Sequence, residues 1–317
     1  MAYRYLFGPV CSRRLGTSLG IDLVPLKTCT LNCVYCECGR TTTLTGERRE
    51  YVPTDQVIAE VDEYLAKNPD LDYVTFAGSG EPTLHSGIGE IISFIKDRYP
   101  HYRIAVLTNG TLFTDPAVRA ALMRADLVIP SLDAVSEEAF RKINRPCPGI
   151  TAGDVLEGLR TFAEEFTGEL WLEVFIVRDL NDTEEEILLL KDAIASINPD
   201  HIQINTLDRP GAEIWVRPAL PLALERIASI LGGSTEVIGA VRAGQAIPQK
   251  AEEVIDLLLA TIRRRPCTLD DLTAILGLRP AEVTKCLRIL EAEGRVEPIR
   301  EERGVFYRMV GARPSPE

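Results

Sequence analysis

Six short apolar runs alternate with amphipathic segments between residues 17 and 207. The apolar runs cover residues 19–25, 73–78, 103–110, 126–133, 170–177 and 201–207. Segments that read as helices lie near 54–67, 87–98, 115–124, 136–143, 152–166 and 183–196. Nearly continuous apolar strands that alternate with helices are typical of a parallel sheet buried on both faces. The pattern predicts an α/β fold, a partial (β/α)6 TIM-type barrel, with a doubly wound sheet as the alternative.

Two of the predicted helices begin at residues that favour helix N-caps. Thr54 precedes the segment DQVIAEVDEYL, and Ser136 precedes EEAF. A hydroxyl at the N-cap accepts a hydrogen bond from a free backbone N–H of the first turn. We therefore expect Thr54 and Ser136 to cap their helices.

The pattern changes towards the C-terminus, where residues 232–248 read as a linker. Three helical segments follow, punctuated by Pro266, Gly277 and Gly294, and two strand-like segments then flank residues 302–304. This order predicts a winged helix-turn-helix domain at 249–317, after a barrel at 1–231. Residues 250–317 carry equal numbers of basic and acidic residues, whereas DNA readers usually present a basic face. Docking of a protein or peptide, or packing, is therefore favoured over DNA binding.

Polar residues lie near the carboxyl ends of several predicted strands. The members of this set are Ser131, Asp133, Glu173, Gln203 and Asn205. A barrel with a purely structural interior is filled by branched apolar side chains. The polar set therefore indicates a barrel mouth lined for a ligand, although some of these groups could be satisfied polar residues of the core.

Composition narrows the class of protein. The chain has 317 residues, 45% of them hydrophobic and 26% charged, as expected of a globular protein. It has no run of 18 apolar residues and no apolar N-terminal segment of signal-peptide length, so we expect a cytoplasmic protein without a membrane partner. The net charge of −12 argues against a non-specific grip on nucleic acid. The 8 cysteines of such a chain indicate metal ligands or reactive thiols rather than disulfides.

Three cysteines follow one spacing directly after the first predicted strand. Cys29, Cys33 and Cys36 form the pattern C-x3-C-x2-C. Three thiolates on a short loop suit three irons of a [4Fe–4S] cluster and leave the fourth iron open. A zinc site needs four ligands, usually as two separated pairs. Cys38 could supply a fourth ligand, but the chain has no second C-x2-C pair, so the cluster is favoured over zinc.

With Tyr35 before the third cysteine, this motif resembles the signature of the radical S-adenosylmethionine (SAM) superfamily. The stretch GSGEPTL at 78–84 follows the second strand, where that superfamily carries a glycine-rich turn that ends in Glu-Pro. The resemblance implies an enzyme in which SAM chelates the open iron. An electron from the cluster cleaves SAM to methionine and a 5′-deoxyadenosyl radical, which takes a hydrogen atom from the substrate. A low-potential donor of the flavodoxin or ferredoxin type is the expected redox partner.

The resemblance also implies residue roles. Cys29, Cys33 and Cys36 would hold the cluster, and Tyr35 would lie against the adenine of SAM. The methionine ammonium would meet a turn composed of Gly78, Ser79, Gly80 and Glu81. Ser131 and Asp133 would contact the ribose or the carboxylate. Further lining residues would be Asn109, Glu173, Gln203 and Asn205.

Residues 7 to 210 more narrowly resemble the wyosine-synthase-like branch of that superfamily. The resemblance rests on the entry sequence FGPVCSRRLG, the loop CTLNCVYCECG at 29–39 (the cluster loop), INRPCPG and LWLEVFIV. Wyosine synthase modifies a transfer RNA guanosine with pyruvate and holds a second cluster with upstream cysteines. Here only Cys11 lies upstream of the motif, and Lys27 and Lys142 are the nominees for a Schiff base with pyruvate. These departures favour a relative with another substrate.

Three more cysteines are expected near the barrel mouth. Cys11 lies in the N-terminal entry, Cys38 in the cluster loop just after Cys36, and Cys147 after the fourth strand. One hypothesis is that they bind an auxiliary metal, a second iron–sulfur cluster. The alternative is that they are unrelated small residues, or that one is a reactive thiol.

Three functions remain open on the sequence. The leading one is a radical SAM enzyme that acts on a peptide, protein or other macromolecule docked on the C-terminal domain. The second is modification of a transfer RNA base of the wyosine type. The third is an iron–sulfur regulator that senses redox state and binds DNA through its wing.

Overall fold

The computed structural model describes residues 3–12, 14–238, 251–301 and 303–311. An eight-stranded sheet forms the body of the protein, in the order β1-β2-β5-β6-β7-β8-β9-β10. Its strands are β1 (Leu6–Ser12), β2 (Gly16–Ile21), β5 (Tyr73–Phe76), β6 (Arg103–Thr108), β7 (Leu127–Pro130), β8 (Glu169–Ile176), β9 (His201–Thr206) and β10 (Thr235–Val237). Only β1 runs antiparallel to its neighbour, and every other pair in the sheet is parallel.

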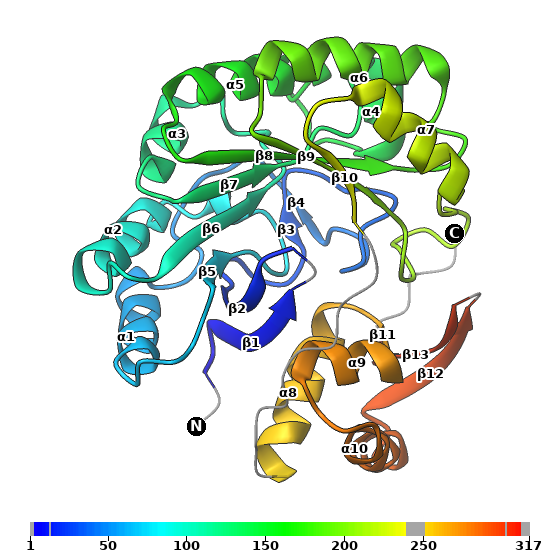
Figure 1. Cartoon of the computed structure of the whole chain (residues 1–317). Coiled ribbons are helices and arrows are strands. Elements are labelled where there is room, and N and C mark those ends of the chain that lie inside the picture. The colour runs from blue at the N-terminus through cyan, green and yellow to red at the C-terminus, as the bar shows by residue number, and fades with distance from the viewer. Residues whose placement is uncertain (1–2, 13, 239–250, 302, 312–317) are drawn as a thin grey trace.

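Helices connect the parallel strands and cover the outer face of the curved sheet (Figure 1). They are α1 (Thr54–Leu65), α2 (Ile88–Arg98), α3 (Pro116–Leu122), α4 (Glu137–Ile143), α5 (Ala152–Glu165), α6 (Glu184–Ile197) and α7 (Pro221–Leu231). Within the described residues, the edge strands β1 and β10 do not pair with each other, so the sheet stays open. The predicted α/β fold with a parallel, partial-barrel sheet is confirmed.

Helix caps follow local chemistry, with one correction. The Ser136 hydroxyl accepts a hydrogen bond from the amide of Ala139, as predicted. The prediction for Thr54 was wrong, because Pro53 occupies the N-cap and Thr54 is the first helical residue. The carboxylate of Glu50 instead accepts the Thr54 amide at 2.8 Å. An acidic side chain thus replaces the hydroxyl at this helix start.

The C-terminal part has its own hydrophobic core, separate from that of the sheet. Its elements are α8 (Ala251–Arg264), β11 (Cys267–Thr268), α9 (Leu269–Leu276), α10 (Pro280–Ala292), β12 (Val296–Glu301) and β13 (Gly304–Met309). Thr268 and Asp271 form a capping box at the start of α9, and Gly277 ends that helix in the left-handed conformation. This order of elements is the one expected of a winged helix-turn-helix, an assignment that stays a prediction.

Two strands of the sheet were not anticipated from the sequence. β1 lies in the N-terminal entry, which carries no apolar run, and β10 lies inside the predicted linker 232–248. β10 pairs with β9, so the sheet extends beyond residue 231. The part of that linker from 239 onwards lies outside the described residues.

The C-terminal domain lies against the β1 edge of the sheet (Figure 1). Val10 of β1 packs against the core of that domain, and the Arg264 guanidinium of α8 stands 3.9 Å from the ring centroid of Phe7. No helix among the described segments is long and apolar enough to cross a membrane.

Candidate functional site

The three cysteines of the C-x3-C-x2-C motif lie on the long loop between β2 and α1. Cys29 ends the short strand β3 (Thr28–Cys29), which pairs with β4 (Thr43–Leu44) and pins the start of this loop. The amide of Cys36 donates to the carbonyl of Cys33 at 3.2 Å, closing a tight turn between these two residues. The three thiols are close enough for the charges of Cys29 and Cys36 to act on Cys33.

Each of the three thiols has a nitrogen donor beside its sulfur. The Asn109 amide nitrogen lies 3.5 Å from the Cys29 sulfur, and the Asn144 amide nitrogen lies 3.5 Å from the Cys33 sulfur. The Lys27 ammonium lies 3.0 Å from the Cys36 sulfur. A ring of N–H donors around three sulfurs is an environment prepared for negative charge on those sulfurs.

The surroundings perturb the thiols strongly. Burial, reinforced by Glu81, raises the pKa of Cys29 to about 12. Burial and the nearby Asp133 also raise the pKa of Cys33. Cys36 differs, because a hydrogen bond from Cys38 outweighs burial and, with Lys27, lowers the pKa of Cys36 to about 5. Without a metal, burial keeps Cys29 and Cys33 protonated. A metal binds cysteine as the thiolate, so a bound iron–sulfur cluster would take the place of these protons.

The glycine-rich turn after β5 packs tightly between the cluster loop and β2. A Cβ on Gly80 would lie 1.9 Å from the carbonyl oxygen of Thr28, and a Cβ on Gly78 would meet the Asp22 carboxylate. The Ser79 hydroxyl donates to Asp22 at 2.6 Å. Both glycines are therefore needed for close backbone approach, and the turn fixes the start of the cluster loop.

Glu81 is buried within the protein instead of facing an open site. Its carboxylate accepts hydrogen bonds from the Thr108 hydroxyl at 2.6 Å and from the backbone N–H of Asn109 at 2.8 Å. The Thr83 amide donates to it at 3.0 Å, and this bond caps the short helix Pro82–Leu84. Glu81 thus joins the β5 turn to the end of β6 and positions Asn109 beside Cys29.

Tyr35 and Asp133 meet across the barrel mouth. The Tyr35 hydroxyl donates to the Asp133 carboxylate at 2.5 Å, and its ring stacks on Phe175 with the centroids 3.8 Å apart. Asn144 also donates to Asp133, at 2.7 Å, while the other oxygen of Asp133 accepts the Phe175 amide. Burial raises the pKa of Asp133 to about 6 in spite of these donors. Ser131 and Asn109 line the same small cavity as Tyr35 and Asp133.

Three more predicted residues lie on β8 and β9. Glu173 pairs with Arg14 and accepts from the Asn205 amide at 3.0 Å. Gln203 lies opposite Glu173 in the sheet and is 1% exposed. Its side-chain oxygen has no hydrogen-bond partner among the described residues. Because Glu173 and Gln203 are paired across the sheet, they lie on the same face of it, and the ligand-binding role of this set stays a prediction.

The other cysteines and lysines of the sequence analysis separate in space. Cys11 and Cys38 line one cavity, and the Cys38 thiol donates to the Gly78 carbonyl at 3.7 Å. Cys147 is buried, and its amide donates to the Thr30 carbonyl at 2.8 Å. Lys142 forms an ion pair with Glu138 in α4, so of the two lysine nominees only Lys27 lies at the cluster loop.

The profile of the Radical SAM superfamily matches residues 23–190, more than half of the chain. The chain belongs to the radical SAM superfamily. It is therefore an enzyme of the class that cleaves SAM, and it binds SAM and a [4Fe–4S] cluster. This confirms the superfamily, the enzyme class and these two cofactors as predicted from the cysteine motif.

Two curated proteins are similar to this chain in sequence. A UPF0026 protein of Methanocaldococcus jannaschii is 37% identical over 235 residues, covering 74% of this chain and 72% of that protein. A protein of Brachyspira hyodysenteriae named GTPase Obg is 42% identical over 204 residues, or 64% of this chain. This match spans only 30% of the length of the Brachyspira protein.

Among solved structures, the chain is similar to Streptococcus suis SuiB bound to the precursor peptide SuiA. The TM-score is 0.54 and the identity 14%, over 70% of this chain and 49% of the SuiB chain. At this identity the similarity shows the fold alone. The narrower resemblance to wyosine synthase stays a prediction.

The residues present fit the cluster that the superfamily binds. Besides the three thiols and their N–H donors, the side-chain oxygen of Asn144 is buried without a hydrogen-bond partner among the described residues. This orphaned acceptor lies in the small cavity with Tyr35 and Asp133, beside Cys33. An unsatisfied buried oxygen in a radical SAM protein is consistent with a polar ligand group at this position.

No three His, Cys, Asp or Glu side chains within the described ranges are arranged to hold a single metal ion. A single tetrahedral ion needs its ligands converged on one point, whereas each cysteine of a [4Fe–4S] cluster binds a different iron. The same finding applies to Cys11, Cys38 and Cys147, whose auxiliary-metal role stays a prediction.

Two contributors to the site were not anticipated. Asn144 contacts both Cys33 and Asp133, and Asp22 holds the glycine-rich turn. Asn144 lies in the stretch INRPCPG, from which the sequence suggested only the subgroup resemblance and Cys147. Asp22 could have been suspected as an acidic residue directly after an apolar strand, because strand ends form the mouth of a parallel barrel.

Proposed function

We propose that Cys29, Cys33 and Cys36 hold the [4Fe–4S] cluster of this enzyme and that its substrate loses a hydrogen atom in the barrel interior. The observation that carries the proposal is the set of three thiols on one loop, each with its own N–H donor. Such donors stabilise the added negative charge of a reduced cluster.

When bound, the cluster supplies the electron that splits SAM into methionine and a 5′-deoxyadenosyl radical, which abstracts hydrogen from the substrate. The protein contributes position and exclusion of water. Lys27 places a positive charge beside Cys36. Burial alone would lower the pKa of Lys27, but the negative charge of neighbouring cysteines, Cys36 first, outweighs burial and raises that pKa. We infer that Lys27 serves as a positive charge beside the cluster loop, and its nomination for a Schiff base stays a prediction.

The residues proposed to bind SAM line the mouth between β5 and β9. The backbone of the glycine-rich turn lies close to the cluster loop at Gly78, Ser79 and Gly80. Glu81 anchors this turn to the end of β6 through the Thr108 hydroxyl. Tyr35, Asn109, Ser131 and Asp133 share the adjoining cavity. Glu173, Gln203 and Asn205 lie on the neighbouring strands β8 and β9, and we infer that they extend this lining. The unpartnered oxygen of Gln203 supports a ligand there, because buried acceptors are normally satisfied.

We further propose that the substrate is a peptide, protein or other macromolecule contacted through the C-terminal domain. Two observations support it. That domain packs against β1 at the barrel opening, and the structurally similar SuiB binds a precursor peptide. Modification of transfer RNA and DNA binding by the C-terminal domain stay predictions, as does a flavodoxin-type or ferredoxin-type electron donor.

Anaerobic incubation of the reconstituted enzyme with SAM and dithionite tests the proposed ligands. The wild type should form 5′-deoxyadenosine, and Cys36→Ala should form less than about a hundredth as much, because the loop loses one of its three iron ligands. Cys286→Ala removes a buried thiol of the C-terminal core and serves as the matched control. Equal activity in Cys36→Ala and Cys286→Ala would contradict the assignment of the cluster ligands.

A further inference from the structure

A cavity of about 250 Å³ lies between the barrel and the C-terminal domain. On the barrel side it is lined by Phe7 and Cys11 of β1 and by Thr75 of β5. On the other side it is lined by Leu257, Thr261 and Arg264 of α8. Gly78 of the glycine-rich turn also reaches it, so the cavity adjoins the residues proposed to hold SAM. Neither domain alone would enclose this space.

The charged side chains that line this cavity are all positive. Three arginines line it, Arg14, Arg264 and Arg265, and no Asp or Glu of the described residues is among its lining. Most of the remaining wall is apolar. Ligand pockets of this kind bind a mostly apolar body and orient it through a few polar groups. The field of this pocket favours a group with negative charge.

Arg264 is the one of these three arginines with a buried nitrogen that lacks a partner among the described residues, although its guanidinium also lies against the ring of Phe7. Arg14 pairs with Glu173, and Arg265 lies 3.5 Å from Glu37. The nearest carboxylate to Arg264 is that of Asp22, at 3.7 Å. The buried Nε of Arg264 has no partner among the described residues, although one terminal nitrogen donates to the Ala260 carbonyl at 2.8 Å. Burial lowers the pKa of Arg264, which reflects the cost of a cation placed here without a full partner.

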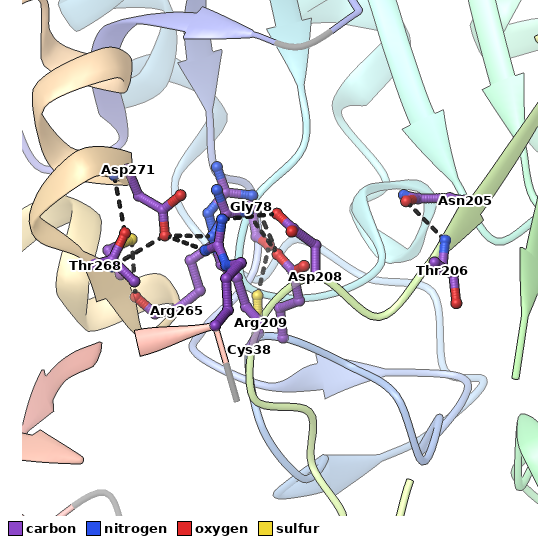
Figure 2. Close-up of polar contacts among 12 residues, drawn as sticks. Cys38, Gly78, Asn205, Thr206, Asp208, Arg209, Arg265, Thr268 and Asp271 are labelled. Atoms are coloured by element: carbon purple, nitrogen blue, oxygen red, sulfur yellow. Dashed lines mark hydrogen bonds and ion pairs between the residues drawn. The ribbon is translucent and has the colours of Figure 1, made fainter. Parts of the chain in front are cut away.

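A buried ionic contact holds α8 and its domain against the barrel. Arg209 is completely buried and lies 3.1 Å from Glu37 of the cluster loop and 3.3 Å from Asp271 of α9. Arg303 adds contacts to Asp271 and to Asp208. Figure 2 shows Asp208, Arg209 and Asp271 gathered where the two domains meet. The position of α8, which carries Arg264, is thus fixed relative to the cluster loop.

We propose that this cavity binds the reacting part of the substrate, an organic anion with an apolar body, and that Arg264 pairs with its carboxylate or phosphate. The proposal rests on the function proposed above and adds a substrate class to it. The C-terminal domain then completes the substrate pocket. Its contribution is the guanidinium of Arg264, whereas the guanidinium that the barrel supplies, that of Arg14, is paired with Glu173.

Binding of small probes to the reconstituted enzyme, without reductant, tests this pocket. Isothermal titration calorimetry compares 3-phenylpropionate with its neutral analogue 3-phenylpropanamide, and phenyl phosphate forms a second arm. The two acids should bind at least about tenfold more tightly than the amide, because a charge-assisted hydrogen bond is worth more than about 1.5 kcal/mol. The tighter of the two acids identifies the anion as a carboxylate or a phosphate.

Two neighbouring arginines of α8 provide a matched pair of variants. Arg264→Gln should reduce the preference for the acid to less than about twofold, and Arg264→Lys should retain part of it. Arg263→Gln makes the same change of charge at an exposed position and should leave the preference unchanged. Ala260→Leu narrows the cavity and should weaken acid and amide alike.

Three results would each overturn the proposed anion site. They are equal binding of acid and amide, no measurable binding of any probe, and an unchanged preference for the acid in Arg264→Gln. Formation of 5′-deoxyadenosine is measured on the same preparations. If it forms while anion preference is absent, the pocket fails and the proposed function stands. If anion preference depends on Arg264 but no 5′-deoxyadenosine forms, the anion site stands and its role as a substrate pocket fails.

Discussion

Asn144 shows how one side chain connects the cluster loop to the small cavity lined by Tyr35 and Asp133. Its amide nitrogen reaches both the Cys33 sulfur and the Asp133 carboxylate, at 3.5 Å and 2.7 Å. Hydrogen bonds to the sulfurs of an iron–sulfur cluster help to set its reduction potential. Asn144 is therefore expected to tune the cluster as well as to orient Asp133.

Replacement of Asn144 should lower the reduction potential of the cluster. The donor stabilises the reduced, more negative state, so Asn144→Ala loses about 1 kcal/mol of that stabilisation, or about 40 mV for one electron. Asn144→Asp should lower the potential further, because it places a carboxylate beside Cys33. Potentiometric titration followed by electron paramagnetic resonance measures both. Unchanged potentials in the two variants would show that this contact does not reach the cluster.

Gly80 is a second residue on which the site depends. Gly80→Ala would place a Cβ 1.9 Å from the Thr28 carbonyl oxygen, so the turn or the cluster loop must move. We expect a loss of about 1–3 kcal/mol in the free energy of unfolding, as in other overpacked positions, and a lower iron content after reconstitution. Gly153→Ala is the control, because the nearest atom to its Cβ lies 3.7 Å away. Equal stability and iron content in the two variants would contradict the tight-turn account.

At the scale of elements, the sequence predicted the parts that a strong pattern specifies. The strands β5, β6, β7 and β9 are buried on both faces over most of their length and therefore appear as apolar runs, whereas β8 alternates partly buried and buried residues in its first half. β1 escaped prediction because LFGPVCS mixes apolar residues with Gly and Pro, and β10 because its three residues are too short for a period. The cysteine motif can be recognised from the sequence because its spacing is local, and the assignment of its three cysteines to the cluster stays a prediction.

The contact between α9 and the barrel was beyond the reach of sequence reasoning. It depends on Arg209, which lies in the stretch DRPG that lacks a helical or strand period, and on Asp271, which was treated only as part of a helix. Two charges 62 positions apart give no local signal of their pairing. The cavity that Arg264 lines could not be predicted either, because its lining residues are far apart in the sequence.

Asp271 should make this contact sensitive to acid. Burial alone would raise its pKa, but Arg209, the Thr268 amide and Arg303 lower the pKa of Asp271 to about 2. Because the pKa is lower in the folded state, the ionised carboxylate stabilises the fold above about pH 4, and this contribution is lost as the pH falls towards 2. At neutral pH it amounts to about 2 kcal/mol.

Denaturant unfolding of Asp271→Asn measures this contribution. The variant should be less stable than the wild type by about 2 kcal/mol at pH 7, and the difference should shrink between pH 4 and pH 2. Asp270→Asn changes the exposed neighbour on the same helix and serves as the control. A difference that does not change with pH would show that Asp271 acts through packing rather than charge.

For the whole molecule, the ionic contact of Arg209 should join two cores into one cooperative unit. Its side chain is 0% exposed and bridges Glu37 and Asp271. Arg209→Gln leaves these two acids without their shared guanidinium, and breaking a buried pair costs about 3–5 kcal/mol. Because the C-terminal core is separate from that of the sheet, calorimetry of the variant should show two unfolding transitions where the wild type shows one.

An exposed pair supplies the comparison for this experiment. Arg226 lies 3.4 Å from Glu184, with more than two thirds of each side chain exposed, at 69% and 73%. Arg226→Gln should change the stability by less than about 1 kcal/mol and leave a single transition. If Arg209→Gln behaves like Arg226→Gln, the two domains are held together by their apolar contacts instead.

The account as a whole depends on one iron that the three cysteines leave open for SAM. Electron paramagnetic resonance of the dithionite-reduced enzyme, with and without SAM, tests this most directly. We predict that SAM changes the spectrum of the wild type, because its amino and carboxylate groups bind that iron, and that Cys29→Ala/Cys33→Ala/Cys36→Ala shows no such change. A wild-type spectrum that SAM leaves unaltered, or a triple variant that responds like the wild type, would contradict it.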